Sequence, residues 1–390
     1  MWRLVLVVSL LCCSSEASVS CKDENGAEVD WYILYKTPKS QEKQLTGVDY
    51  VYIYPDATDN NKTISRLNTK PIDDPKGILA NTLRQLIDFD NNNPTPNFGF
   101  ISYSDQPPKN LKLSVDHSYG HSKGVVMMEK DQTGLWLLHS TPRFPQIGQN
   151  FYPESGTKKG QTFICVTFKY NQFKAIGTHL QYINAFRYYE HIPPDFHVEF
   201  QQPKQPKPGE KRKMIDINKF QELKSRNNKT FNSIAKLLSD KPEVGDLYVT
   251  ISKAVDSDVR AQTWGCQKGR HRSICSKSGK KVENILSVQP NSTWKEWRAT
   301  ADHSKWCVAM DQNKPWTCIA DVNRSESQYK RPGGALCVKD EKIANIFKSF
   351  VKEVEKCSGL GKRDDKSCPD PDPDSDLDPE PEPDSDLDSE

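Results

Sequence analysis

Two stretches of the chain carry the same pattern and decide its fold class: HSKGVVMMEKDQTGLWLLH at residues 121–139 and HSKWCVAMDQNKPWTCIAD at residues 303–321. Each begins with His-Ser-Lys, continues through five mostly apolar residues to a carboxylate at Glu129 or Asp311, and crosses a short polar turn. A second apolar run containing tryptophan follows. Two extended apolar runs joined by a polar turn predict a β-hairpin in each copy, so the chain contains an internal repeat.

The spacing inside each copy places histidine and lysine on one face. Residues i and i+2 of a strand point to the same side, so His121 and Lys123 are expected to project together, as are His303 and Lys305. A single His-x-Lys arises easily by chance in a lysine-rich chain. Two copies inside matched hairpins favour a shared function.

The match extends to the far end of each hairpin. His139 lies 18 residues after His121, and Asp321 lies 18 residues after His303. An isolated histidine in an apolar strand is usually a core residue, but the equal spacing favours a place for His139 in the same site as the motif.

A pair of histidines and a pair of lysines suits cleavage of a phosphodiester. Two lysine ammonium groups would neutralise the phosphate oxygens and stabilise the transition state. One neutral imidazole could attack phosphorus to form a phosphohistidine, while the other, protonated, gives its proton to the leaving oxygen. Because histidine titrates near pH ~6.5, this pairing favours mildly acidic conditions. The sequence has no H-E-x-x-H motif, carboxylate cluster or Cys/His grouping that predicts a metal site, and no cofactor is expected.

The remaining patterns predict a mixed α/β protein. Segments rich in β-branched and aromatic residues predict strands, at residues 29–36, 48–54, 162–169 and 247–252. Helical patterns occur at residues 77–87, 217–238 and 341–354, the last with Asp340 as a candidate N-cap.

The ends and the middle of the chain differ in composition from the rest. Residues 1–18 have the basic start, short apolar run and small residues of a secretory signal peptide. Residues 203–213 predict a linker or exposed loop between an N-terminal half (residues 19–202) and a C-terminal half (residues 214–368). Residues 369–390 hold 11 acidic and no basic residues and predict a disordered acidic tail. The rest of the chain has 54 basic against 41 acidic residues, a balance that suits a polyanion such as DNA.

Cysteine and asparagine usage fits the secretory pathway. Beyond the signal region, nine of the 11 cysteines remain, and several are expected to form disulfides in an oxidising compartment. Asn61, Asn228 and Asn291 head N-x-T sequons and are expected to carry glycans. No later stretch approaches about 18 consecutive apolar residues, so no stable membrane insertion is expected.

With their surroundings, the paired motifs resemble the phospholipase D superfamily and, within it, the deoxyribonuclease II family. The matching segments are VDWY (29–32), YGHSKG (119–124), LHSTP (138–142), CVTFKYN (165–171), DHSKWC (302–307) and WTCIADVNR (316–324). The resemblance implies a phospholipase D-like, pseudo-twofold duplicated sandwich with one active site at the interface of the halves. It also implies metal-independent cleavage of double-stranded DNA to 3′-phosphate ends, in the lysosome or after secretion.

The resemblance further implies residue roles. His121 would be the nucleophile and His303 the general acid. Lys123 and Lys305 would bind the scissile phosphate. Two further residues, His139 and Asn323, would complete the pocket. Asn323 also heads a sequon, and its pocket role would keep it buried and without a glycan. The implied disulfides are Cys21–Cys165, Cys275–Cys357 and Cys318–Cys337, with Cys266, Cys307 and Cys368 left over.

Two other functions fit part of the sequence. A phospholipase D-type hydrolase of a lipid or another phosphodiester would use the same histidines and lysines, although the sequence lacks the Gly-Ser-x-Asn segment usual in that superfamily. A secreted DNA- or polyanion-binding protein without catalysis is the other alternative, and the two intact motifs argue against it. The sequence leaves open whether the chain forms a homodimer.

Overall fold

The computed structural model describes residues 18–56, 62–148, 150–201, 220–275 and 279–356, and the statements below concern these residues. The expected linker (203–213), the acidic tail (369–390), Asn61 and all of the expected signal peptide except Ser18 lie outside them.

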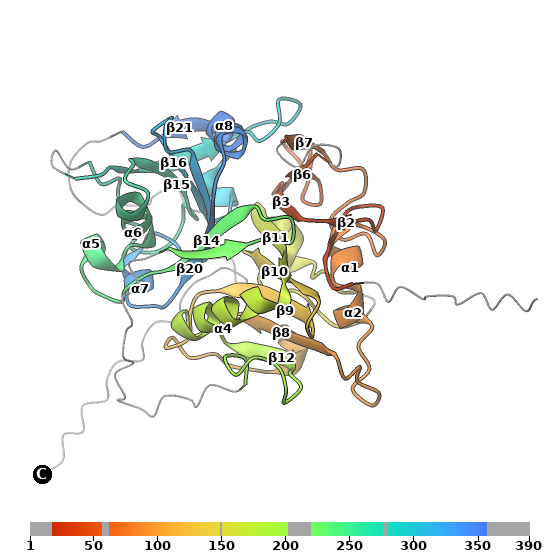
Figure 1. Ribbon diagram of the computed structural model, residues 1–390. Coiled ribbons are helices and arrows are strands. Elements are labelled where there is room, and N and C mark those ends of the chain that lie inside the picture. The colour runs from red at the N-terminus through yellow and green to blue at the C-terminus, as the bar shows by residue number, and fades with distance from the viewer. Residues whose placement is uncertain (1–17, 57–61, 149, 202–219, 276–278, 357–390) are drawn as a thin grey trace, which may run out of the picture.

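Two large β-sheets form the body of the protein (Figure 1). In sheet order, the eight strands of the first are β12 (Arg187–His191), β8 (Phe98–Ser104), β9 (Lys123–Glu129), β10 (Thr133–His139), β11 (Gln161–Lys169), β3 (Trp31–Lys36), β6 (Tyr50–Pro55) and β7 (Thr63–Leu67). Those of the second are β13 (Gln221–Lys224), β14 (Thr230–Ala235), β20 (Gly334–Lys339), β19 (Trp316–Ala320), β18 (Trp306–Ala309), β15 (Val259–Gln262), β16 (Val282–Val288) and β17 (Trp297–Arg298), with β21 (Val351–Val354) paired to β16. Two small sheets pair β1 (Cys21–Lys22) with β2 (Glu28–Val29) and β4 (Lys39–Ser40) with β5 (Leu45–Thr46).

The strand order repeats between the two large sheets. In the first sheet β8, β9, β10, β11 and β3 are consecutive antiparallel neighbours. In the second sheet β15, β18, β19, β20 and β14 follow the same order, also antiparallel. The two predicted hairpins are β9–β10 and β18–β19, and they occupy equivalent places in these two runs. The repeat in the sequence is therefore a repeat in topology.

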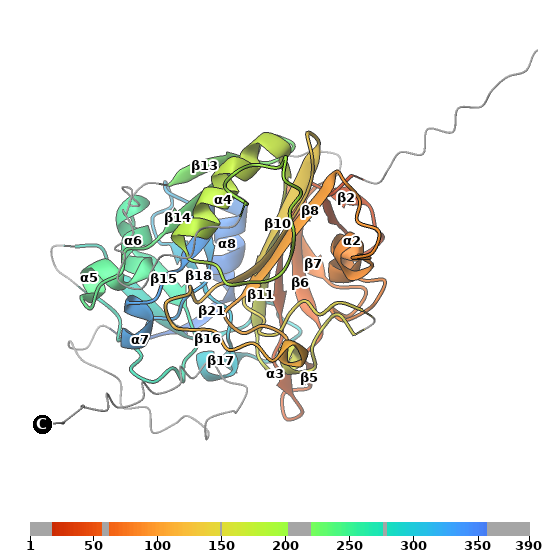
Figure 2. The same cartoon turned by 90° about the horizontal axis from the view of Figure 1, so that it is seen from below.

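The two sheets pack face to face, with helices between them and on their outer faces (Figures 1 and 2). Trp31, Ile33 and Tyr35 of β3 belong to the central core, whereas Tyr32 and Leu34 point to the outer face, as the two-residue period of a strand requires. The central core also contains apolar residues of α4 (Phe173–Tyr182) and α8 (Glu341–Phe350). The outer faces are covered by α1 (Ile78–Thr82), α2 (Arg84–Ile87) and α6 (Leu247–Ala254).

Short helices lie in the connections: α3 (Ser155–Lys158), α5 (Pro242–Gly245), α7 (Glu326–Tyr329) and the 3₁₀ turns η1 (Lys109–Leu111), η2 (Tyr170–Gln172) and η3 (Ala299–Ala301). None of the helices in the described ranges is long and apolar enough to cross a membrane. The mixed α/β class expected from the sequence is confirmed.

The prediction of a strand over residues 247–252 is wrong, because this segment is part of α6. The carboxylate of Asp246 accepts a hydrogen bond from Tyr248 N at 2.8 Å and caps the helix. Leu247 and Ile251 are buried in the outer core of the second sheet. The β-branched residues of this segment favour a strand only weakly, and capping with burial outweighs that preference.

The prediction of a helix over residues 217–238 is wrong for the described part, which forms the β13–β14 hairpin. Its turn places Asn228 at a φ of 67°, a left-handed conformation that asparagine tolerates better than most residues. The helix expected over residues 341–354 begins as predicted, with the Asp340 carboxylate accepting from Ile343 N at 2.9 Å. It ends at Phe350, because the next four residues pair with β16 as β21.

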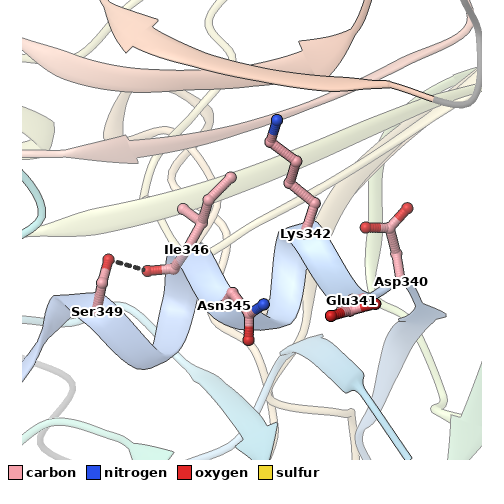
Figure 3. Close-up of a pocket in the computed structure, with 6 residues that line it drawn as sticks. All are labelled: Asp340, Glu341, Lys342, Asn345, Ile346 and Ser349. Atoms are coloured by element: carbon pink, nitrogen blue, oxygen red, sulfur yellow. Dashed lines mark hydrogen bonds between the residues drawn. The ribbon is translucent and has the colours of Figure 1, made fainter. Parts of the chain in front are cut away.

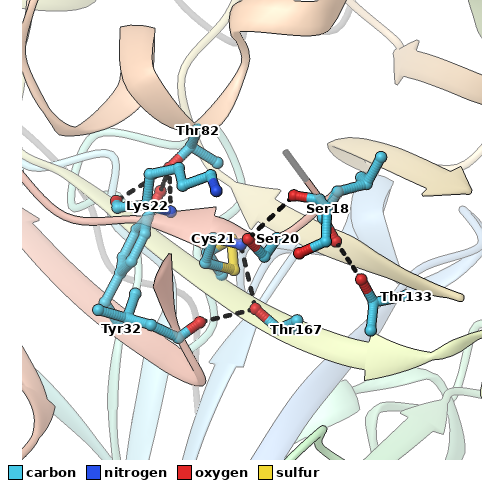
Figure 4. The surroundings of a disulfide bond; sticks show 11 residues. Ser18, Ser20, Cys21, Lys22, Tyr32, Thr82, Thr133 and Thr167 are labelled. Carbon is cyan, nitrogen blue, oxygen red and sulfur yellow. Dashed lines mark hydrogen bonds between the residues drawn. A yellow bond between two sulfur atoms is a disulfide. The ribbon is translucent and has the colours of Figure 1, made fainter. Parts of the chain in front are cut away.

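Two of the three expected disulfides lie within the described residues, and both are present. Cys21–Cys165 ties β1 to β11 (Figure 4). Beside it, Cys21 N donates to Thr167 Oγ1 at 3.0 Å, and that hydroxyl donates to Val29 O at 2.7 Å. This network fixes the start of the described chain on the first sheet.

The second disulfide, Cys318–Cys337, joins β19 to β20. Cys275 is also disulfide-bonded, and Cys357, its expected partner, lies outside the described residues. Cys307 is a buried free thiol, as expected. The expectation that Cys266 is left over is wrong, since Cys266 is disulfide-bonded. Sequence spacing does not reveal which cysteines approach within the ~6 Å between Cα atoms that a disulfide needs.

The two described disulfides are expected to differ in their contribution to stability. Cys21–Cys165 spans 144 residues and Cys318–Cys337 spans 19, and a longer closed loop restricts the unfolded chain more. Removing the first with two serines should lower the free energy of unfolding by about 4–5 kcal/mol, and removing the second by about 3 kcal/mol. Urea unfolding followed by tryptophan fluorescence measures both, and a larger loss for the short loop would contradict the prediction.

Candidate active site

His121 and Lys123 meet at a carboxylate that the sequence analysis missed, Asp105, which follows β8. His121 Nδ1 lies 2.7 Å from Asp105 Oδ2, and Lys123 Nζ donates to Asp105 Oδ1 at 2.7 Å. Arg331, which precedes β20 in the other half, donates to Asp105 Oδ2 at 3.1 Å. One buried carboxylate thus holds the whole first motif and joins it to the second half of the chain.

Asp105 is an anion held by the ammonium of Lys123, the guanidinium of Arg331 and the imidazole of His121. Burial by itself would raise the pKa of Asp105, but His121, Lys123 and Arg331 together lower this pKa well below its ordinary value. An ionised carboxylate accepts hydrogen bonds and cannot donate them. The proton between the two side chains therefore resides on His121 Nδ1, so the neutral form of this ring has its lone pair on Nε2.

The second histidine has a different neighbour. The ring of His303 contacts Trp264, with ring centroids 4.7 Å apart, and Lys305 Nζ donates to His303 O at 3.1 Å. The registers of β8–β9 and β15–β18 place Trp264 at the position that Asp105 occupies in the first half. The repeat therefore gives one histidine a carboxylate and the other an indole, so the two imidazoles are not chemically alike.

His139 is buried, and its ring packs against Phe144 and Phe163, with centroids 4.9 and 5.7 Å away. Burial lowers the pKa of His139 well below its usual range, and the positive charge of Lys123 adds to this. The imidazole is therefore neutral near Lys123, where it can accept or donate one hydrogen bond but brings no charge.

The equal spacing of His139 and Asp321 does not make them structural equivalents. The register of β9–β10 places His139 opposite Lys123, whereas Ala320 lies opposite Lys305, its N–H donating to Lys305 O at 2.8 Å. Asp321 is one residue further along. The turns of the two hairpins differ in geometry, and an equal count of residues cannot reveal that difference.

Asp321 is a buried carboxyl group on which lysines of both motifs act electrostatically. Its Oδ2 accepts from Gly334 N at 3.1 Å, and its Oδ1 is buried without a hydrogen bond from the described residues. Burial raises the pKa of Asp321 to about 8, opposed by the Gly334 N–H and by the positive charges of Lys123 and Lys305. Both lysines are thus close enough to act on one carboxyl group.

The backbone also joins the two motifs across the halves. His121 N donates to Pro332 O at 3.0 Å, and His303 N donates to Gly160 O at 2.9 Å. Each motif histidine is therefore held by a loop of the opposite half. The four motif side chains are each no more than 2% exposed, so charges at this site are poorly screened by solvent.

The side chain of Asn323 is hydrogen-bonded to the backbone of Trp264. Its Oδ1 accepts from Trp264 N at 3.2 Å, and its Nδ2 donates to Gln267 Oε1 at 3.0 Å. The side chain is buried, which is incompatible with a glycan in this structure. Asn228 is exposed and Asn291 is half-buried, so both remain accessible for glycosylation.

A cavity of about 610 Å³ lies elsewhere, along α8 (Figure 3). It is lined by residues between Asp340 and Ser349, none of which belongs to the two motifs. Across the described ranges, no group of three or more His, Cys, Asp and Glu side chains is arranged to hold a metal ion.

Comparison with known proteins matches residues 20–357 to the family described as deoxyribonuclease II. Deoxyribonuclease-2-beta of Homo sapiens is 33% identical over 347 residues, which cover 87% of this chain and 92% of that protein. Plancitoxin-1 of Acanthaster planci is 32% identical over 371 residues, 91% of this chain and 97% of the relative. Deoxyribonuclease-2-alpha of Rattus norvegicus is 31% identical over 361 residues, 90% and 98% of the two chains. With both motifs inside the matched region, the chain belongs to the deoxyribonuclease II family.

Proposed function

We propose that the protein is an acid endonuclease that hydrolyses double-stranded DNA without a metal ion, through a phosphohistidine, and leaves 3′-phosphate ends. The observation that carries the proposal is that two buried His-x-Lys pairs, one from each half, are each held by a backbone carbonyl of the opposite half, with the charges of both lysines acting on the carboxyl group of Asp321. Two imidazoles and two ammonium groups are the set that a two-step phosphodiester hydrolysis requires. Membership of the deoxyribonuclease II family supports DNA as the substrate.

His121 acts as the nucleophile. Asp105 accepts from its Nδ1–H, so Nε2 attacks phosphorus, the N–P bond forms and the P–O5′ bond breaks. His303, protonated, gives its proton to the departing 5′ oxygen. In the second step, neutral His303 takes a proton from water, the water oxygen attacks phosphorus and the N–P bond breaks. The products are a 3′-phosphate, a 5′-hydroxyl and the original pair of imidazoles.

Lys123 and Lys305 stabilise the negative charge on the non-bridging oxygens in both steps. Asp321 makes this stabilisation dependent on pH. With a pKa of about 8, its carboxyl keeps its proton in acid and leaves both ammonium charges available to the phosphate. His139 and Asn323 complete the pocket, His139 as a neutral ring beside Lys123 and Asn323 as the support of Trp264.

The proposal extends to location. The signal-like residues 1–18, the disulfides and the accessible sequon asparagines Asn228 and Asn291 support entry into the secretory pathway. Activity in acid suits the lysosome, with secretion as the alternative.

The test uses supercoiled plasmid in EDTA at about pH 5 and about pH 7.5. We expect nicking and linearisation at the lower pH, and ends that a polymerase extends only after phosphatase treatment, since a 3′-phosphate blocks extension. Ends extended without phosphatase would exclude the proposed bond scission. If folded protein leaves the plasmid intact but cleaves a phospholipid, the lipid hydrolase is supported; DNA binding without cleavage of either substrate supports the binding protein.

Replacing Asp321 with asparagine is expected to weaken the dependence on pH. Between pH ~4 and pH ~8, the carboxyl group of Asp321 is ionised in the unfolded chain and protonated in the folded protein. The free energy of unfolding therefore falls as the pH rises through this window and is not affected by this group below it. The amide removes that loss. The melting temperature of Asp321→Asn should therefore exceed that of the wild type by more at pH 8 than at pH 4, and its cleavage should decline less steeply above pH 7. Parallel profiles for the two proteins would contradict this role.

A further inference from the structure

We propose that Lys36 and Lys236 are a pair of positioning residues, each of which fixes the loop that holds the catalytic histidine of the opposite half. The inference rests on the proposed function for the roles of His121 and His303. Both lysines are buried, and neither belongs to the two motifs.

Lys36, the last residue of β3, has its ammonium group surrounded by backbone oxygens. Its Nζ donates to Thr37 O at 2.6 Å and to Gly47 O at 2.9 Å within its own strand region. It also donates to Lys159 O at 2.7 Å and to Thr157 O at 3.2 Å. Thr157 belongs to α3, and Lys159 to the short loop that leads from α3 into β11, so Lys36 anchors that loop from inside the protein.

Lys236 stands at the equivalent place in the second half, directly after β14. Its Nζ donates to Tyr329 O at 2.7 Å, in the last residue of α7, from which a loop leads into β20. That loop contains Arg331 and Pro332. Lys236 therefore anchors the segment that supplies both the guanidinium at Asp105 and the carbonyl that accepts from His121 N.

The sheet registers make the two arrangements equivalent. Lys36 pairs with Gln161 in β11, and the preceding residue, Gly160, accepts from His303 N at 2.9 Å. Lys236 N donates to Gly333 O at 3.0 Å, and the preceding residue, Pro332, accepts from His121 N at 3.0 Å. In each half, a buried lysine holds the loop that carries the carbonyl accepting from the histidine N–H of the other half.

There is little room for the loop that contains Gly160 to move. A Cβ on Gly160 would lie 2.6 Å from Asp302 Oδ1, and Asp302 itself accepts from Tyr35 Oη at 2.6 Å and from Trp297 Nε1 at 2.7 Å. The contact between the Gly160 loop and the residue before His303 is therefore closely packed. A shift of the loop moves the histidine backbone with it.

The ammonium group is suited to this task because one atom can satisfy several carbonyl oxygens. Burial lowers the pKa of Lys36 to about 7, opposed by Asp302 and Asp73, and burial lowers the pKa of Lys236 to about 7, opposed by Asp246. In acid, each amine therefore carries three N–H donors. An apolar side chain of similar length would leave the carbonyls unpaired, which the loop would relieve by moving toward water.

The test compares Lys36→Met and Lys236→Met with Lys70→Met, a matched control. Lys70 also donates to two backbone carbonyls, Glu24 O at 2.6 Å and Lys76 O at 2.8 Å, but neither carbonyl touches a motif residue. We expect the first two variants to lose about 10- to 100-fold in kcat on duplex DNA with little change in KM, as for a misplaced catalytic group. The control should keep its rate. Lys36→Gln, which retains two donors, should recover part of the loss.

A second substrate separates the two loops. Thymidine 3′-(4-nitrophenyl phosphate) has a leaving group that needs no proton, so it tolerates a misplaced general acid but not a misplaced nucleophile. The second step still needs His303 as the base, so the informative quantity is the pre-steady-state burst of nitrophenol, which reports the first step alone. Lys36→Met should give this burst at nearly the wild-type rate, and Lys236→Met should not. The reverse split would support the same coupling and assign the nucleophile to His303. Equal losses in the burst and in DNA cleavage for both variants, or rates equal to that of Lys70→Met, would overturn the inference.

A readout without catalysis separates this inference from the proposed function. In ¹H–¹⁵N imidazole spectra, assigned with His121→Ala and His303→Ala, Lys36→Met should shift the His303 resonances and Lys236→Met those of His121. These shifts are expected even if the wild type cuts no DNA in EDTA, which would overturn the proposed function alone. Unshifted resonances in folded variants would overturn the coupling.

Discussion

Replacing His121 with alanine is expected to reduce plasmid cleavage at about pH 5 by roughly 10⁴-fold or more, because the variant lacks the side chain that forms the covalent intermediate. His303→Ala should cost about 10²- to 10⁴-fold, the range for loss of a general acid. Both variants should still bind DNA, since Lys123 and Lys305 remain. The measurement is the initial nicking rate in EDTA, together with affinity for a duplex oligonucleotide.

His197→Ala is the matched control. This histidine contacts Tyr170 O at 3.1 Å and lies outside both motifs, so its removal should leave the rate unchanged. Quenching of wild type in alkaline SDS, in which a phosphohistidine is stable, should trap 5′-end-labelled DNA on the protein, and His121→Ala should trap none. Undiminished cleavage by either motif variant would refute the two-histidine mechanism.

Asp105→Asn is expected to lower kcat by about 10²- to 10⁴-fold, although the residue lies outside the motif. An amide carries no negative charge and can turn its NH₂ toward His121, so the imidazole loses the tautomer that exposes Nε2; loss of a carboxylate behind a catalytic histidine has effects of this size elsewhere. Lys123 and Arg331 also lose the anion they share. Single-turnover rates on an oligonucleotide duplex measure the change.

The carboxylate of Asp105 also determines how far the pH can fall before the folded protein loses stability. In the folded protein the pKa of Asp105 lies well below its ordinary value. The ionised carboxylate therefore stabilises the fold at any pH above the ordinary pKa, and this stabilisation is lost only as the pH falls through the lowered pKa. Wild-type protein should therefore remain folded at about pH 5, where Asp105→Asn should melt at a lower temperature. Asp116→Asn, in an exposed turn, is the control, and a kcat for Asp105→Asn equal to that of this control would disprove the assignment.

The location of the site was largely predictable from the sequence, but its composition was not. The repeated His-Ser-Lys stretches identified both histidines and both lysines, and the hairpins that carry them are present as β9–β10 and β18–β19. Asp105 and Arg331 carry no motif, since each is a single charged residue in a loop. Asp105 directly follows Ser104, which pairs with Lys123 in β8–β9. Only knowledge of this strand pairing could have indicated Asp105 as a site residue.

By itself, the sequence determined the mixed α/β class, the internal repeat and the residues that we propose carry the chemistry, because these depend on local period and on side-chain type. The tertiary structure decided that residues 247–254 form a helix and that Asp321, not its spacing counterpart His139, lies within reach of both lysines. It also decided which half holds which histidine. Arg331 and Asp105 are 226 residues apart in the chain. Contacts at that separation depend on how two sheets pack together, and neither local pattern nor residue spacing encodes that packing.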